Sequence, residues 1–368
     1  NGYNLAVERI NSMGGVKVGG KTYKFEIIYY DDESNSGRAA QLAERLIKQD
    51  GVQFMLGPYS SGLTKAMAPV TEKYGIPMVE ANGASRSLFT KGYKYLFAVL
   101  APANLYLDVA ITTAVELNGG KTIAIQLEAP LYSINWELVK QKINSRTKMI
   151  IINTPQNPSG RIFSKSDMLK LQEITKGTNI LVLSDEVYEH IIFDNEKHQS
   201  ACLFPDLKSR SLVVASFGKT FHNTGWKTGY CCAPKELTEE FRKVHQFNVF
   251  CVNHPVQKGL AEYLKEPGHY LELSQFYQEK RDLFLSLIEP SRFKFIPSMG
   301  TYFQVLDYSE ITIENDVAFA KRLVIESGIA AIPLSVFNSN NLDNKVLRFC
   351  FAKTNDTLQE AAEILNSI

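Results

Sequence analysis

Long hydrophobic runs, net charge and cysteine are all scarce in this sequence, and each shortage excludes a class of protein. No run approaches the roughly 20 apolar residues that a membrane-spanning helix needs. The 40 basic and 39 acidic residues nearly cancel, which leaves a net charge of +1 and no basic stripe for nucleic acid. The five cysteines are odd in number and irregularly spaced, which predicts neither a disulfide framework nor a zinc site. We therefore expect a protein of a reducing compartment, the cytoplasm, with no metal and no membrane span.

The composition that remains is that of an ordinary globular protein. Hydrophobic residues make up 45% and charged residues 21% of 368 positions, enough chain for two or three domains. The chain opens directly on a helical pattern. We therefore expect no signal peptide, and a first domain that lacks its beginning.

Apolar spacing divides the chain into three predicted domains. Residues 1–115 alternate helix and strand, which predicts a parallel sheet covered by helices. Residues 116–270 continue this alternation, and residues 271–368 mix long helices with short strands as a smaller α+β domain. The predicted fold class is therefore α/β, with parallel or mixed sheets covered by helices. Predicted strands lie at 23–30, 52–56, 77–80, 122–127, 148–153, 180–183, 211–215, 301–306 and 346–351, and predicted helices at 36–49, 63–74, 135–143, 164–175, 255–264, 271–288 and 315–326.

Polar side chains follow three predicted strands of the second domain. Asn157, Asp185 and Lys219 each come after an apolar run. Ligands of doubly wound sheets bind beyond the carboxyl ends of the strands, so these three side chains are expected to converge. A buried lysine readily becomes a neutral, nucleophilic amine, which forms a Schiff base with a carbonyl cofactor. The pattern therefore predicts pyridoxal 5'-phosphate chemistry.

Neighbouring residues supply the other groups that this cofactor needs. Asp185 is predicted to keep the pyridine nitrogen protonated, so that the ring acts as an electron sink. Tyr188 and Asn157 are candidates to hydrogen-bond the ring phenolate oxygen. Ser216 and Lys227 are candidates to bind the phosphate.

Two further roles concern the substrate. After the Schiff base exchanges, Lys219 is predicted to act as the general base at the substrate Cα. Arg348 lies within an apolar strand and needs a partner, which a substrate carboxylate supplies in bidentate geometry. Each residue alone also has a structural explanation. Asp185 and Asn157 suit turns or helix caps, and Arg348 could pair with an internal carboxylate.

Several longer motifs surround these positions, and they resemble those of a known family. Residues from about 116 to 368 resemble the class I/II aminotransferases of fold type I, in the methionine and kynurenine aminotransferase branch. The motifs that carry the resemblance lie at 153–158, 184–190, 216–221, 224–230, 242–247, 300–303, 331–337 and 347–349.

This resemblance implies particular residue roles and a particular reaction. Lys219 would hold the cofactor, Asp185 would pair with the pyridine nitrogen, and Arg348 with Asn157 would hold the substrate carboxylate. A homodimeric enzyme would transfer the amino group of a large neutral amino acid, of the methionine or aromatic type, to a 2-oxo acid. Elimination from cysteine conjugates by a β-lyase is the alternative within this branch.

A different set of motifs occupies the first part of the chain, at 4–11, 14–16, 30–34, 46–52 and 57–61. Through them, residues 1 to about 110 resemble the first lobe of type I periplasmic binding proteins, as in the branched-chain amino-acid receptors of ABC importers. The resemblance implies that Ser60 and Ser61, with the turn at Asn82 and Gly83, hold the ligand's α-amino and carboxylate groups. A Ser-Ser turn after a strand also serves as a helix cap. The rival function is therefore a non-catalytic amino-acid-binding module.

The two resemblances meet between about residues 105 and 125, where a Gly-Gly turn that feeds a strand suits both families. We therefore expect a chimera of two incomplete parts. The receptor part would lack its first strand, hinge and second lobe. The aminotransferase part would lack its amino-terminal third, which supplies a helix N-terminus that cups the phosphate, a stacking aromatic ring and much of the dimer interface.

Overall fold

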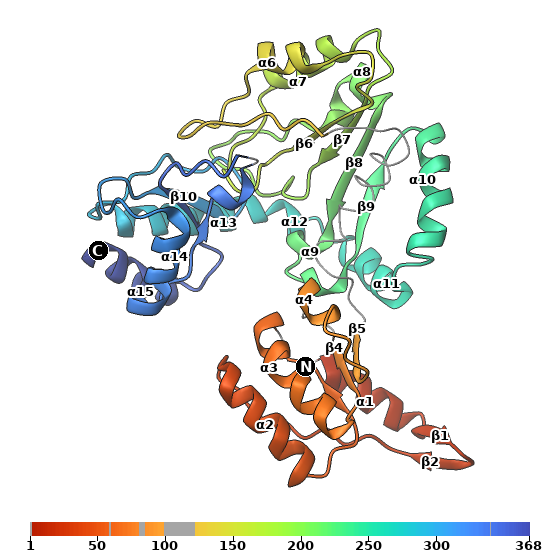
Figure 1. Cartoon of the computed structure of the whole chain (residues 1–368). Coiled ribbons are helices and arrows are strands. Elements are labelled where there is room, and N and C mark those ends of the chain that lie inside the picture. The colour runs from red at the N-terminus through yellow and green to blue at the C-terminus, as the bar shows by residue number, and fades with distance from the viewer. Residues whose placement is uncertain (1, 59, 81–84, 99–121, 339) are drawn as a thin grey trace. The chain divides into compact units, whose positions relative to one another are not determined.

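The computed structural model describes all residues except 1, 59, 81–84, 99–121 and 339, and the chain forms two compact units (Figure 1). The first unit is Asn1–Thr122 and the second is Ile123–Ile368. Within the described ranges, every helix is too short or too polar to cross a membrane.

The first unit is built on two helices, α2 and α3, and a small parallel sheet of strand order β3-β4-β5. Asn35 begins α2 and Ser60 begins α3, each through a side-chain oxygen that accepts a backbone N–H of the first turn. Ala43 of α2 and Met67 of α3 share a core with Met78 of β4. The elements are α1 (Gly2–Ser12), β1 (Val16–Val18), β2 (Lys21–Tyr23), α2 (Ser36–Lys48), β3 (Met55–Leu56), α3 (Ser61–Tyr74), β4 (Met78–Glu80), α4 (Arg86–Phe89) and β5 (Leu96–Ala98).

Two predicted strands are wrong. Residues 24–30 form no strand, although β2 just before them pairs with β1, and residues 122–127 form none either. A strand needs a neighbour that accepts its backbone hydrogen bonds, and the described residues supply none beside either segment. Accordingly, Phe25 stays 43% exposed and Ile123 stays 50% exposed.

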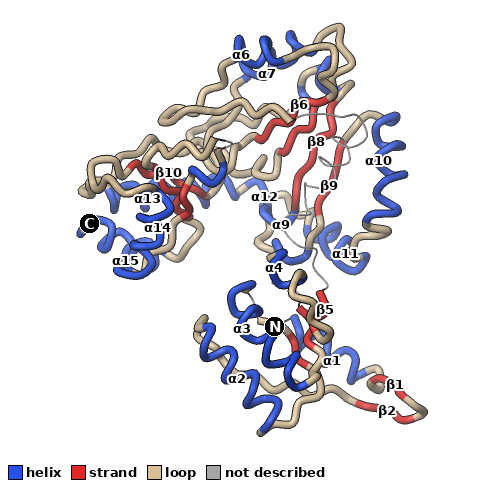
Figure 2. The backbone as a smooth tube through the Cα atoms, viewed as in Figure 1, coloured by secondary structure: helices blue, strands red, loops and turns tan. Residues whose placement is uncertain are grey.

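A four-stranded sheet of order β6-β7-β8-β9 forms the first half of the second unit (Figure 2). Strands β6, β7 and β8 are parallel, and β9 is antiparallel to β8. Alternate side chains such as Ile152 and Val182 point to one face, where they pack on Met168 of α7. Ser164 and Asp167 form the predicted capping box that begins α7. The elements are α6 (Trp136–Lys142), β6 (Met149–Asn153), α7 (Lys165–Thr175), β7 (Leu181–Asp185), η1 (Ala201–Leu203), α8 (Pro205–Lys208), β8 (Ser211–Ser216), α9 (Phe217–Thr220), η2 (Thr224–Trp226) and β9 (Gly229–Cys232).

A second, antiparallel sheet of order β10-β12-β11 lies in the same unit and is covered by long helices. Tyr188, Ile191 and Phe193, which follow β7, share its hydrophobic core. The α/β class with mixed sheets covered by helices is thereby confirmed, and the shared core holds the second sheet near the end of β7. The elements are α10 (Lys235–Asn248), α11 (His254–Tyr263), α12 (Gly268–Leu271), α13 (Leu273–Ile288), β10 (Phe303–Asp307), α14 (Asp316–Ser327), β11 (Ile332–Pro333), η3 (Ser335–Phe337), β12 (Val346–Cys350) and α15 (Asn355–Ser367).

Candidate active site

The site begins where β6, β7 and β8 end. Cross-strand register places Asn153 opposite Asp185, and Asp185 opposite Val214. The Asn153 amide donates to the Asp185 carbonyl at 3.1 Å, and its Oδ1 accepts from the Asn157 backbone N–H at 2.9 Å. These contacts fix the loop that carries Asn157 beside the end of β7.

Lys219 lies on the short helix α9, one turn beyond β8 rather than on the strand itself. Ser216 begins this helix, because its Oγ accepts from the Gly218 N–H at 3.1 Å. A Cβ at Gly218 would lie 2.9 Å from the Cα of Thr224, so the backbone packs closely where it turns. The sequence thus fixes the direction in which Lys219 leaves the sheet.

The Lys219 amine lies among several charged groups. Burial lowers the pKa of Lys219, and the positive charges of Lys227 and Arg348 lower it further. Cys350 and Asp185 act in the opposite sense. The amine is therefore neutral, and able to act as a nucleophile, more often than that of an exposed lysine.

Asp185 and Tyr188 lie on the turn that follows β7. Burial raises the pKa of the Asp185 carboxyl, which accepts from the Val187 N–H at 3.2 Å, and the charge of Lys219 opposes this rise. Tyr188 is 2% exposed and packs edge-on against Tyr302, with ring centroids 5.3 Å apart. Burial holds the pKa of Tyr188 far above its ordinary value, so its hydroxyl is available as a hydrogen-bond donor.

Arg348 of β12 is half-buried between two aromatic rings. Its guanidinium carbon lies 3.9 Å from the ring centroid of Phe303 and 5.8 Å from that of Phe337. Its Nη1 donates to Asn157 Oδ1, and no carboxylate among the described residues lies within ion-pair distance of it. Burial lowers the pKa of Arg348, and the Tyr188 hydroxyl is the first of the groups that oppose this. A desolvated guanidinium paired only with an amide is a ready site for a carboxylate.

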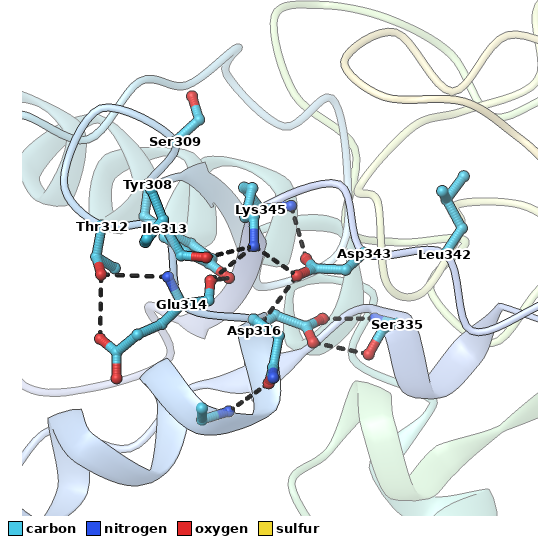
Figure 3. Close-up of polar contacts among 12 residues, drawn as sticks. Tyr308, Ser309, Thr312, Ile313, Glu314, Asp316, Ser335, Leu342, Asp343 and Lys345 are labelled. Atoms are coloured by element: carbon cyan, nitrogen blue, oxygen red, sulfur yellow. Dashed lines mark hydrogen bonds and ion pairs between the residues drawn. The ribbon is translucent and has the colours of Figure 1, made fainter.

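A polar network that includes Asp316, Ser335 and Asp343 lies beside η3, the short helix that carries Phe337 (Figure 3). Asp316, which is 1% exposed, accepts from both the N–H and the hydroxyl of Ser335, each at 2.7 Å. Asp343 accepts in turn from the Asp316 N–H at 3.2 Å. Because Ser335 begins η3, this network sets the position of Phe337 at the end of that helix.

Ser216 and Lys227, the predicted phosphate ligands, lie at the junction of β8 and β9. Ser216 pairs with Gly229, and its Oγ lies 3.5 Å from the Thr228 carbonyl. Lys227 is exposed and adopts the left-handed conformation with φ of 51°, which is uncommon for a residue other than glycine. The Ser216 hydroxyl thus lies near the backbone that bears Lys227, beside α9.

These side chains fit pyridoxal phosphate in their chemistry. The cofactor needs an amine for its aldehyde, a carboxyl for its ring nitrogen and donors for its phosphate. Lys219, Asp185 and the pair Ser216 and Lys227 offer these groups from adjacent strand ends. No cluster of His, Cys, Asp and Glu in the described part of the chain could hold a metal ion.

A cleft of about 380 Å³ opens beside Asn157 and was not foreseen in the sequence. Gln156, Pro158, Phe337 and Tyr132 line it. The Tyr132 hydroxyl is buried and has no hydrogen-bond partner among the described residues. Burial raises the pKa of Tyr132 to about 12, so the hydroxyl stays protonated. No local pattern marks this tyrosine, because only the folded chain brings it to the cleft.

The predicted receptor-type site in the first unit has a different character. Ser60 is the N-cap of α3, and the Ser61 hydroxyl accepts from the Ser85 N–H at 3.1 Å. Both serine hydroxyls therefore accept hydrogen bonds from backbone N–H groups of the first unit. Asn82 and Gly83 lie outside the described residues.

Two family models match the chain. The model described as aminotransferase class I and II matches residues 97–365, and the model described as periplasmic binding protein matches residues 1–140. The two matches overlap, as expected of a sequence whose join suits both families.

Individual relatives agree with the first of these models. The methionine aminotransferase of Escherichia coli (strain K12) is 44% identical over 256 residues, which cover 69% of this chain and 66% of that protein. The kynurenine–oxoglutarate transaminase of Dictyostelium discoideum is 32% identical over 258 residues, which cover 64% of this chain and 59% of that protein. The match therefore spans between 59% and 66% of the length of these curated relatives.

A solved structure gives the same picture. The crystal structure of YbdL from Escherichia coli, reported with a methionine aminotransferase function, matches with a TM-score of 0.68 and 43% identity. The match covers 70% of this chain and 68% of that one.

Proposed function

Because this chain belongs to the class I and II aminotransferases, we propose that it is a pyridoxal 5'-phosphate-dependent aminotransferase. Its amino donor is a large neutral amino acid of the methionine or aromatic type, and its acceptor is a 2-oxo acid. The relatives named as methionine and kynurenine aminotransferases support this substrate class.

One observation carries the proposal. The Lys219 amine lies close enough to both Asp185 and Arg348 for their charges to shift its pKa. These three groups come from α9, the end of β7 and β12, which are widely separated in sequence. An amine, a carboxyl and a guanidinium that has no carboxylate partner among the described residues are the groups that an amino acid and this cofactor require together.

Each residue then has a defined task. Arg348 binds the substrate α-carboxylate through its fork, while Asn157 holds one end of the guanidinium in place. Lys219 takes and returns the proton at the substrate Cα, a step that its lowered pKa favours near neutral pH. Asp185 pairs with the ring nitrogen, and the positive charge of a protonated ring would favour the charged form of this buried carboxyl. Pyridoxal phosphate, when bound, supplies the electron sink for the charge that develops at Cα.

The cleft beside Asn157 supports a neutral substrate side chain. Every residue that lines the cleft is uncharged, and about 380 Å³ is room for the side chain of methionine or an aromatic amino acid. A charged side chain placed there would lose its hydration without gaining an ion pair. The uncharged walls therefore favour large neutral amino acids over acidic or basic ones.

An amino-transfer assay tests the proposal directly. The purified chain is mixed with pyridoxal phosphate, methionine and 2-oxoglutarate, and the new 2-oxo acid is measured by chromatography. We expect product from the native chain and a loss of at least about 100-fold in Lys219→Ala, because the base at Cα is removed. Lys235→Ala, at an exposed lysine of α10, is the matched control and should keep the activity. Product that forms equally well in Lys219→Ala would refute the proposal.

A second candidate function rests on the periplasmic-binding-protein match at residues 1–140. In this alternative the first unit binds a branched-chain amino acid at Ser60 and Ser61, without catalysis. Calorimetry with leucine tests it. Binding heat that is lost in the double variant Ser60→Ala and Ser61→Ala, but kept in Lys219→Ala, would favour the binding module.

We also propose that the chain forms a homodimer. Helix α10 carries a line of exposed apolar side chains: Phe241, Val244 and Phe247 are 41%, 59% and 83% exposed. Such a line on one helix is typical of a surface that another chain covers. Light scattering on the purified protein should give twice the mass of one chain, and Phe247→Glu should halve it.

A further inference from the structure

Arg281 of α13 is only 4% exposed, and its guanidinium donates four hydrogen bonds. Two go to Asp194 as a bidentate pair, each at 2.7 Å. One goes from Nε to Asp282 at 2.8 Å, and one goes to the Ser298 carbonyl at 2.8 Å. Nη2 also lies 2.7 Å from the Asp282 carboxylate as an ion pair. The guanidinium also lies 4.8 Å from the ring centroid of Phe193. Ser298 is the first residue of a short segment, residues 298–301. This segment contacts the Asn157 loop on one side and the residues that follow β7 on the other.

On one side, the 298–301 segment holds the loop that carries Asn157. The N–H groups of Met299 and Gly300 both donate to the Gly160 carbonyl, at 2.9 and 3.0 Å. A Cβ at Gly160 would lie 2.6 Å from the Cβ of Ser298, so the two backbones are as close as glycine allows. Any movement of the segment therefore moves the Asn157 loop.

On the other side, the same segment holds the residues that follow β7. The Thr301 N–H donates to the Ile191 carbonyl at 3.0 Å, and the Ile191 N–H donates to the Tyr188 carbonyl at 2.8 Å. Gly300 lies between these residues and the Asn157 loop, where there is no room for a side chain. A Cβ there would lie 2.8 Å from the Ile191 oxygen and 2.9 Å from the Cβ of Pro155. The segment is thus a spacer between the Asn157 loop and the turn that bears Tyr188.

We propose that Arg281 is a positioning residue for the carboxylate end of the site. By holding the 298–301 segment, it sets the distance between the Asn157–Arg348 pair and the Lys219 amine. This inference rests on the proposed function, because that distance matters only if a substrate bridges the two groups. Lysine cannot take its place, since an ammonium has three donors and no planar fork.

The test is Arg281→Lys in the full chain loaded with pyridoxal phosphate. Amide hydrogen exchange at Met299 and Gly300 should accelerate about tenfold, the factor expected when one or two buried hydrogen bonds are lost. Calorimetry with 3-(methylthio)propionate, a carboxylate without an amino group, should show about tenfold weaker binding for the same reason. The amount of cofactor held on Lys219 should not change.

Two further variants keep the test decisive. Arg322→Lys alters an arginine of α14 that pairs with Glu314 and Glu326, away from the 298–301 segment, and should change neither exchange at that segment nor binding. Gly300→Ala disturbs the spacer without touching Arg281 and should reproduce the weaker carboxylate binding, even if Arg281→Lys fails to fold. Unchanged carboxylate affinity in both Arg281→Lys and Gly300→Ala, with the cofactor still on Lys219, would overturn this inference alone. A native chain that never holds the cofactor would overturn the proposed function and this inference with it.

Discussion

Each unit of this protein has a parallel strand followed by a serine that begins a helix, and the two turns differ in what their polar groups do. In the first unit, Ser60 caps α3 and Ser61 accepts a backbone N–H from Ser85. In the second, Ser216 caps α9 in the same way, but one turn later Lys219 buries an amine. The first turn uses its polar side chains to complete the fold. The second holds a group whose burial opposes folding, and such groups gather at functional sites.

The directions of the pKa shifts show how the two turns differ in their effect on stability. Burial raises the pKa of Asp185 and lowers that of Lys219, so the charged form of each is less stable in the folded chain than in the unfolded one. The capping serines are uncharged, so their burial carries no such penalty. Substitutions at four positions, ordered from the largest effect to the smallest, break or sharpen this contrast.

Arg348→Met should have the largest effect. The substrate carboxylate loses its bidentate partner, so kcat/KM should fall on the order of 100-fold. The cofactor should stay on Lys219, because Arg348 does not hold it in this account. Arg322→Met, which removes an arginine with carboxylate partners elsewhere in the unit, is the control. Equal losses in the two variants would mean that Arg348 acts through stability rather than through the substrate.

Glu186→Ala should cost about 2 kcal/mol of unfolding free energy, because it leaves buried donors unsatisfied. Glu186 is 1% exposed and accepts from Ser184 at 2.7 Å, from His198 at 2.7 Å and from the Ala201 N–H at 3.0 Å. Urea unfolding measures the loss. A cost below about 1 kcal/mol would contradict a structural role for this residue next to Asp185.

The pH dependence of Glu186 provides a finer test. Burial by itself raises the pKa of Glu186, but the hydrogen bonds and the charge of His198 outweigh it, so the net shift is downward. A carboxyl with a lowered pKa stabilises the fold above its ordinary value of 4.5 and loses that contribution as the pH falls through the lowered pKa. Urea midpoints of the native chain should therefore drop between about pH 5 and about pH 3, and drop less in Glu186→Gln.

Asp185→Asn should stabilise the cofactor-free chain near neutral pH by about 0.5–2 kcal/mol. The folded-state pKa of Asp185 is raised, so its penalty grows as the pH rises through that value, and a neutral amide removes it. The same variant should lose amino transfer. Thermal unfolding without cofactor, compared at about pH 4 and about pH 7, should show the gain only at the higher pH. A loss of stability in this variant would mean that Asp185 stabilises the fold, as the capping residues do.

Ser60→Ala should cost about 1 kcal/mol of stability in the first unit, through the lost cap of α3. Hydrogen exchange within α3 should speed up, while amino transfer stays the same. An effect on transfer without one on exchange would reverse the contrast between the two turns.

Local features of the fold were predictable, and features that need a distant partner were not. The capping box at Ser164 and the strand that ends at Asp185 follow from short patterns whose physics is local. Residues 24–30 and 122–127 carry strand-like alternation, but a strand also needs a neighbour, and the pattern cannot report whether one exists.

The residues of the candidate site also divide into those that a local pattern marks and those that only tertiary contacts reveal. Lys219, Asp185 and Arg348 were predicted because their residue types are unusual at the ends or in the middle of apolar strands. Tyr132 and Arg281 were missed, because a tyrosine in a loop and an arginine in a helix are ordinary until tertiary contacts bury them. Their positions depend on the packing of β10, α13 and the loop at Asn157, which no single stretch of sequence encodes.

The central claim is that the Lys219 amine is the group that holds a carbonyl cofactor. The most direct measurement incubates the chain with pyridoxal phosphate, reduces the mixture with borohydride and locates the modified lysine by mass spectrometry of the digested protein. We expect one cofactor per chain, on the peptide that contains Lys219. Modification spread over exposed lysines such as Lys235 and Lys243, with Lys219 unmodified, would contradict it.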